Sequence, residues 1–297
     1  MHTGRRWLVS SAPVAFVLLW STGFVAARYA TDDAGPLTFL AVRLSAAAVV
    51  LALVARVLHA AVPSRPQAGW LCVTGVLMHA VYLGGVFIAI EQGLPSGVSA
   101  LIIGLHPVLT SLAAGPVLGE HLRRIQWVGV GLGFLGVVAV VVDRLLAHSG
   151  DITGGPLVAV SVSMVAMSVG TLVQRRRCAT APLLWGTVVQ YAASSVVLIV
   201  GAGLAEGFEI RFTASTWFAM AWSLFVLSIA AVLIMLWLLQ RDAAATVSSL
   251  FFLTPALSTL EGAILFDEQL GLLALAGLVV ALVGVAMVTR RGVPTAR

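Results

Sequence analysis

The chain has 297 residues, of which 60% are hydrophobic and only 10% are charged. A soluble domain carries about 25% charged residues, so this chain cannot cover a water-facing surface, and lipid must be its solvent. The net charge of +5 comes from arginine alone, because the sequence contains no lysine. Cys72 lies in an apolar segment and Cys178 follows Arg177, which argues against a disulfide framework.

Apolar segments recur along the whole sequence. A bilayer core about 30 Å thick requires about 20 apolar residues for each helix that crosses it. The pattern therefore predicts an all-α integral membrane protein with ten transmembrane helices, at 12–31, 36–58, 68–90, 96–118, 125–142, 155–173, 182–204, 215–239, 244–266 and 270–289. The first segment follows two arginines and could be a signal peptide, but it is long for one and has a counterpart in the second half.

Arginine placement predicts the orientation of these helices. If the N-terminus is cytoplasmic and the helices alternate, the outer side holds only Arg28, Arg144 and Arg211. The cytoplasmic side then holds Arg5, Arg6, Arg56, Arg65, Arg123, Arg124, Arg175, Arg176, Arg177, Arg241, Arg290, Arg291 and Arg297. Such an excess of arginine sets topology, so we expect both termini in the cytoplasm. The positive charge then reflects topology, and we expect no nucleic-acid partner.

Two stretches repeat each other at a spacing of 148 residues, from Leu105 to Val140 and from Leu253 to Val288. The shared residues that are uncommon in so apolar a chain are Pro107 and Pro255, Glu120 and Glu268, Gly129 and Gly277, and Gly136 and Gly284. Internal repetition indicates a duplication, which predicts repeats at 1–148 and 149–297. Because five helices is an odd number, the second repeat must be inverted, as in many secondary transporters.

The sequence resembles the drug/metabolite transporter superfamily, in its EamA branch. The resemblance covers essentially the whole chain and rests on the ten helices in two halves, the early Trp20-Ser21-Thr22-Gly23-Phe24, Arg43 in the second helix, and the way each half closes as Pro, Glu and a glycine-rich helix. It implies a solute carrier of the inner or plasma membrane that exports amino acids or related metabolites. Ser168 replaces Trp20 in the second half and Gln190 lies near the position of Arg43, so the site should be asymmetric.

Arg43 and Glu261 are ionisable groups inside predicted helices, where a charge costs about 2.5–3.5 kcal/mol and is a functional candidate. The planar guanidinium of Arg43 could bind a carboxylate of the substrate. Alternatively, it pairs with an acid or reaches the outer surface. Glu261 could bind an ammonium group or carry a coupling proton, or it could be a structural partner of Arg43. A site that uses both would suit a zwitterionic amino acid.

His79 and His106 are the further candidates for proton coupling, because histidine titrates near physiological pH. His79 lies near the middle of the third helix, three residues before Tyr82 on the same face, and could instead be a hydrogen-bonded packing residue. His106 precedes Pro107, which disfavours helical geometry and removes a backbone donor, so His106 could sit beside an exposed carbonyl facing the cavity. We expect Pro107 and Pro255 to break their helices at the site.

Aromatic and amide side chains could line an amphipathic cavity, although such residues are often interface anchors or ordinary packing. The candidates are Trp20, Tyr82, Gln190 and Trp237, with Trp185 and Trp222 as further possibilities. Glu120 and Glu268 end their helices near water, where a structural or gating role is expected. The small residues Gly129, Gly133, Gly277 and Ala281 predict close packing between the halves or a homodimer face.

Several motifs are absent from the sequence: a phosphate-binding loop, a His-Glu-x-x-His zinc pair and a Gly-x-Ser-x-Gly nucleophile turn. We therefore expect no enzyme, no cofactor and no metal. The sequence favours a secondary transporter that works by alternating access. Its expected partners are a small-molecule substrate and the lipid bilayer, and both a monomer and a homodimer are compatible with the sequence. The alternatives are an intramembrane enzyme acting on lipid or isoprenoid, and the same fold carrying sugars, nucleotide derivatives or cationic drugs.

Overall fold

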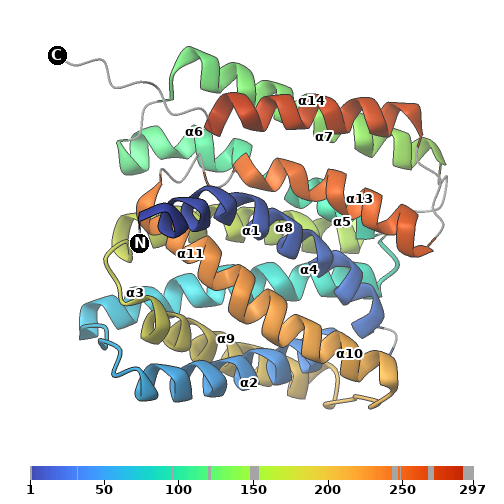
Figure 1. Ribbon diagram of the computed structural model, residues 1–297. Helices are drawn as coiled ribbons and strands as arrows, with labels where there is room; N and C mark the ends of the chain where they lie inside the picture. The colour runs from blue at the N-terminus through green and yellow to red at the C-terminus, as the bar shows by residue number, and fades with distance from the viewer. Residues whose placement is uncertain are drawn as a thin grey trace.

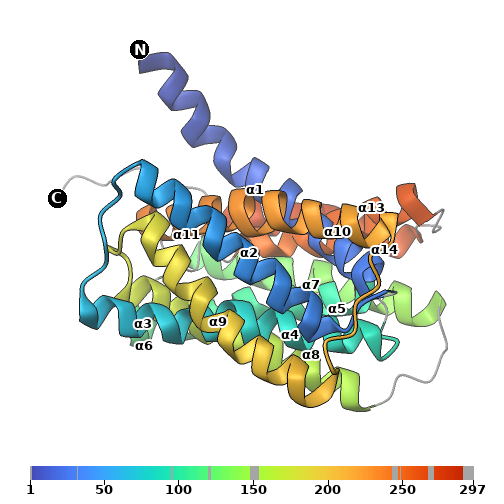
Figure 2. The same ribbon diagram turned by 90° about the horizontal axis from the view of Figure 1, so that it is seen from below.

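The computed structural model describes residues 2–31, 33–94, 96–119, 122–147, 154–242, 247, 249–266 and 271–289. The described chain is a bundle of helices whose axes run roughly along one direction (Figures 1 and 2). Its one isolated β-bridge within these ranges pairs Ala34 with Ile210. The prediction of an all-α membrane fold is therefore confirmed.

The helices fall where the apolar segments predicted them. In the first half they are α1 His2–Thr31, α2 Pro36–Val57, α3 Arg65–Gly75, the π-helix η1 Val76–Val81, α4 Tyr82–Glu91, α5 Ser96–Ile103, α6 His106–Leu118 and α7 Arg124–Ala147. In the second half they are α8 Gly154–Arg177, α9 Leu183–Ala205, α10 Ala214–Trp222, the π-helix η2 Ser223–Ala231, α11 Val232–Arg241, the 3-10 turn η3 Leu250–Phe252, α13 Leu253–Phe266 and α14 Leu272–Thr289.

Six continuous stretches of the described residues are long and apolar enough to cross a bilayer. They are Ala12–Thr31, Pro36–Val57, Arg65–Glu91, Gly154–Arg177, Leu183–Ala205 and Ala214–Arg241. The fourth predicted helix is not continuous: α5 ends at Ile103 and α6 begins at His106, with Pro107 in its first turn. In the second half the 3-10 turn η3 precedes α13 at the corresponding place.

The break before α6 leaves no bare carbonyl at His106. Its backbone oxygen accepts a hydrogen bond from Thr110 Oγ1 at 3.0 Å and another from Ser168 Oγ at 3.2 Å. An unpaired backbone group in hydrocarbon costs several kcal/mol, so irregular backbone is tolerated only where the protein supplies partners. The carbonyl of His106 itself is therefore covered by hydroxyl groups.

The packing of the helices follows a pseudo-twofold axis. α2 packs against α9 and α7 packs against α14, which pairs each helix with its counterpart in the other half. Other contacts also join the two halves in matching pairs: α1 packs on η2, and α8 packs on η1. Figure 1 shows α7 and α14 together on one side of the bundle and α2 and α9 together on the opposite side.

Glycine permits the close approach of α7 and α14. A Cβ atom on Gly129 would lie 2.7 Å from the carbonyl oxygen of Gly284, and a Cβ atom on Gly284 would lie 2.6 Å from that of Gly129. Gly136 meets Gly277 and Ala281 in the same way. These contacts are the close packing between the halves that the small residues predicted, because no side chain fits between the two backbones.

Both ends of the bundle are fastened by polar contacts. At one end Arg175 Nη1 donates to the carbonyl of Leu239 at 2.9 Å, and the guanidinium of Arg177 lies 4.8 Å from the ring centre of Trp70. At the other end the carboxylate of Glu206 accepts from the backbone N–H groups of Leu37 and Thr38, each at 2.8 Å. A negative charge at that position stabilises the positive N-terminus of α2.

Gly129→Ala should destabilise the protein, whereas Gly131→Ala on the same helix should not. The added methyl group at Gly129 meets backbone, and overpacking of this kind costs about 1–3 kcal/mol. At Gly131 a Cβ atom meets nothing within 4 Å, and alanine is a better helix former than glycine by about 1 kcal/mol. Thermal unfolding in detergent measures the difference; equal midpoints for the two variants would contradict the packing described here.

Glu206→Ala should lower the thermal midpoint, because it leaves the first N–H groups of α2 without their acceptor. Loss of a helix N-terminal cap costs about 0.5–2 kcal/mol. The matched control is Glu209→Ala, since Glu209 is exposed and its hydrogen bonds are made by its backbone: its carbonyl accepts from Gly35 at 3.0 Å and its N–H donates to the carbonyl of Glu206 at 3.4 Å. If both substitutions shift the midpoint equally, the carboxylate of Glu206 has no special role.

Candidate functional site

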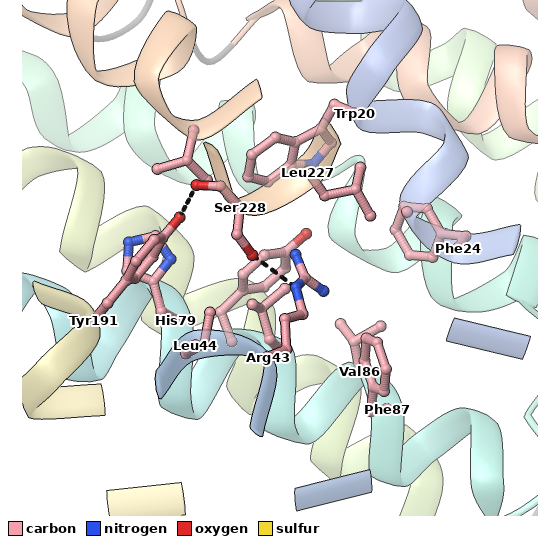
Figure 3. Close-up of a pocket in the computed structure, with 14 residues that line it drawn as sticks. Trp20, Phe24, Arg43, Leu44, His79, Val86, Phe87, Tyr191, Leu227 and Ser228 are labelled. Carbon is pink, nitrogen blue, oxygen red and sulfur yellow. Dashed lines mark hydrogen bonds between the residues drawn. The ribbon is translucent and has the colours of Figure 1, made fainter. Parts of the chain in front are cut away.

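A buried cavity lies between the helices of the two halves near the middle of the bundle. Its volume of about 40 Å³ is room for about three water molecules. It is lined by Trp20, Gly23 and Phe24 of α1, Arg43 and Leu44 of α2, His79 of η1, Tyr82, Leu83, Val86 and Phe87 of α4, Tyr191 of α9, Leu227 and Ser228 of η2 and Val232 of α11. Figure 3 shows these side chains converging from both repeats.

Arg43 is the charged group of this cavity. Its side chain is only 4% exposed, and its Nε donates to Ser228 Oγ at 2.7 Å (Figure 3). The hydroxyl of Tyr191 donates to the backbone carbonyl of the same Ser228. Within the part of the chain that the structure describes, no carboxylate pairs with Arg43. The guanidinium is thus a buried cation whose remaining N–H groups are available to an anionic solute.

Aromatic rings form the apolar wall opposite Arg43. Trp20 and Tyr82 stack nearly parallel, with an interplanar angle of 11° and 6.5 Å between ring centres. Phe251 packs edge-on against Trp20 at 5.3 Å and holds it from outside the cavity. Rings fixed in this way offer large flat surfaces to the apolar part of a solute.

His79 lines the cavity and also belongs to a buried hydrogen-bond network. Its Nε2 lies 3.4 Å from Gln190 Oε1, and its ring meets Tyr191 edge-on at 4.8 Å. The amide nitrogen of Gln190 donates to Thr74 Oγ1 at 3.0 Å and to Gln174 Oε1 at 2.8 Å. Gln190 therefore does not line the cavity; it connects His79 to α3 and α8.

Glu261 does not share this cavity with Arg43. It accepts a hydrogen bond from Ser21 and lines a second cavity on the flank of the bundle, together with residues of α1 and α10. The helix α1 separates the two, because Trp20 and Phe24 face one cavity while Thr22 faces the other. The structure thus brings Arg43, His79, Trp20 and Tyr82 together and leaves Glu261 apart.

Other residues singled out in the sequence lie away from the central cavity. His106 is fully buried with its ring edge-on to Phe251 at 4.5 Å, and neither of its ring nitrogens has a hydrogen-bond partner among the described residues. Trp237 lies under the guanidinium of Arg241 at 4.1 Å, close to the end of α11. Glu120 and Glu268 lie outside the described residues, as does the side chain of Pro255, whose backbone continues α13.

Tyr191 and Ser228 belong to the site, and sequence reasoning missed them. Tyr191 directly follows Gln190, which lies near the position of Arg43 in the other half. Both Gln190 and Tyr191 lie on α9, the helix that packs against α2. A hydroxyl inside the apolar run of η2 was the available signal for Ser228. The described residues contain no group of three His, Cys, Asp or Glu side chains placed to hold a metal ion.

Comparison with known proteins agrees with this architecture. The model of the EamA-like transporter family matches twice, at residues 9–142 and 155–290. The chain is 24% identical over 278 residues to the "Uncharacterized inner membrane transporter YedA" of Escherichia coli K12, covering 93% of this chain and 88% of the relative. It is 25% identical over 296 residues to an "Uncharacterized transporter" of Archaeoglobus fulgidus, covering 97% and 99%.

A solved crystal structure has the same fold. It superimposes with a TM-score of 0.77 at 20% identity, covering 94% of this chain and 96% of the other. The two family matches span nearly all of both halves. Together with the helical bundle, they show that this multi-pass membrane protein belongs to the EamA-like transporter family.

Proposed function

We propose that the protein is a secondary transporter that exports a small organic carboxylate, an amino acid or related metabolite, through the central cavity. The observation that carries the proposal is the buried guanidinium of Arg43, which has no acid partner among the described residues. A lone buried cation is costly unless a ligand compensates it, and a guanidinium binds a carboxylate through two parallel hydrogen bonds.

Alternating access is supported by the small volume of the central cavity. At about 40 Å³ it is far below the roughly 300–1,000 Å³ of pockets that hold small molecules. A solute therefore enters only if the helices that line the cavity separate. Two inverted repeats that rock about a site between them provide such a movement, and this site is built from both repeats.

The site favours carboxylates with an apolar body over strongly polar solutes. Arg43 supplies the charge, while Trp20, Phe24 and Phe87 supply the walls. An amino acid would place its ammonium group against the faces of Trp20 and Tyr82, because Glu261 lies in the other cavity. For proton coupling, His79 is the strongest of the three candidates His79, His106 and Glu261, since it alone lines the central cavity.

The proposed location is the inner or plasma membrane with both termini in the cytoplasm. The excess of arginine at one set of helix ends favours that orientation, and one relative is named as an inner membrane transporter.

Arg43→Gln should lower export about tenfold or more, because charged hydrogen bonds of about 1.5–3 kcal/mol are lost. Arg43→Lys keeps the charge but not the planar fork, so its rate of export should fall between that of the native chain and that of Arg43→Gln. The control is Arg56→Gln, the same change on the same helix at an exposed position. Initial rates of solute release from cells that contain equal amounts of folded protein give the comparison; equal rates for Arg43→Gln and Arg56→Gln would refute the role of Arg43.

The solute itself can be identified by expressing the chain in a host that lacks it and loading the cells with mixed dipeptides. Cells with the native chain should release one or a few amino acids into the medium several-fold faster than cells with Arg43→Ala. Mass spectrometry of the medium identifies which. An unchanged medium would exclude amino-acid export, and uptake of labelled apolar carboxylates would then test the remaining part of the proposal.

A further inference from the structure

The cavity on the flank of the bundle has the size and chemistry of a separate ligand site. Its volume is about 540 Å³, within the roughly 300–1,000 Å³ of pockets that bind small molecules. It is lined by Thr22, Val25, Ala26 and Tyr29 of α1, Ser215, Phe218, Ala219 and Trp222 of α10, and Glu261 of α13. We propose that it binds a single-chain amphiphilic primary amine that enters from the lipid phase.

Glu261 supplies the recognition of the amine. One side of its carboxylate accepts a hydrogen bond from Ser21, while Oε2 is buried and has no hydrogen-bond partner among the described residues. A carboxylate accepts hydrogen bonds from N–H groups, and a primary ammonium brings both the positive charge and three donors. A quaternary ammonium brings the charge without a donor and leaves Oε2 unsatisfied.

Aromatic side chains supply the surface for the apolar part of the ligand. Phe218 stacks on Trp222 with 6.1 Å between ring centres and an angle of 24°. Trp222 is itself fixed, because its indole Nε1 donates to Thr22 Oγ1 at 2.9 Å. Phe218 is 63% exposed on the flank of the bundle, where a membrane helix meets lipid, so an alkyl chain can lie across it and continue into the bilayer.

The flank site is independent of the central cavity. On α1, Trp20, Gly23 and Phe24 face the central cavity. Another face of the same helix lines the flank cavity, with Thr22, Val25, Ala26 and Tyr29. Figure 1 shows α1 running between α13 on one side and α10 on the other. The charges are also opposite, since the central cavity holds a cation and the flank cavity holds an acid. Binding at the flank therefore does not require that the central solute be known.

Equilibrium binding of radiolabelled dodecylamine to the full chain in phosphatidylcholine nanodiscs tests the proposal. Empty nanodiscs measure partition into lipid, which is subtracted. Saturable binding of about one dodecylamine per chain is expected, with dodecanol and dodecyltrimethylammonium competing at least about tenfold less well, because each lacks a charge or a donor. Equal competition by dodecanol would show that the cavity binds the alkyl chain without recognising the ammonium group, and this result would overturn the proposal. Competition by phosphatidylethanolamine in the nanodisc would overturn it in favour of a lipid headgroup.

Two substitutions locate the binding. Glu261→Gln removes the charge at nearly constant volume and should weaken dodecylamine binding about tenfold or more. Ala26→Leu leaves the Ser21–Glu261 contact in place and fills part of the cavity, so it should also weaken binding. The control is Glu91→Gln, the same change at an exposed helix end, which should bind like the native chain. If Glu261→Gln and Ala26→Leu both bind normally, the amine binds elsewhere and the proposal is wrong. Because the readout is binding, it stays informative whether or not amino-acid export is found.

Discussion

In hydrocarbon every backbone N–H and C=O group must find its partner inside the protein, and this constraint shapes the whole chain. It makes each crossing a helix, and the thickness of the hydrocarbon sets the length that the helix needs. It also decides where a helix can be interrupted. At the break between α5 and α6, the N–H groups of Gly104, Leu105 and Val108 all donate to backbone carbonyls, so the interruption leaves few groups unpaired. The ends of the bundle follow the same rule, since Glu206 receives the first N–H groups of α2.

The same constraint influences the size of the two cavities and the residues that line them. Helices that must satisfy their own backbones can meet closely only through small residues, as α7 and α14 do at Gly129 and Gly284. Where larger side chains face one another, the space between helices is set by those side chains. Around Arg43 this space holds one buried cation among aromatic rings, and around Glu261 it holds one acid beside a lipid-facing aromatic pair. The protein thus separates two opposite charges by the thickness of α1.

The fold could be predicted from the sequence because, in a lipid bilayer, a long apolar segment forms a helix that crosses the membrane. The repeat was visible because Pro107 and Pro255, with a few glycines, stand out against a background of leucine and valine. Arg43 and His79, which line the central cavity, could be chosen as candidates from the sequence because a polar group in hydrocarbon is costly. What could not be predicted was the direction in which each side chain faces. Successive residues of a helix are turned by about 100°, so a small rotation decides which cavity a residue such as Glu261 enters. Tyr191 and Ser228 were missed for the same reason, since their role depends on how α9 and η2 pack.

The two π-helices occupy matching places in the two halves of the chain. η1 begins at Val76 and η2 begins at Ser223, and these starts lie 147 positions apart, the same distance that separates Gly23 from Gly170. A π-helix is rare and is frequently found at a functional site. Both of these border the central cavity, because η1 contributes His79 to its lining and η2 contributes Leu227 and Ser228. The widened turns therefore lie on the walls of the same space, one in each half of the chain, so both halves change their helix geometry where the candidate site is formed.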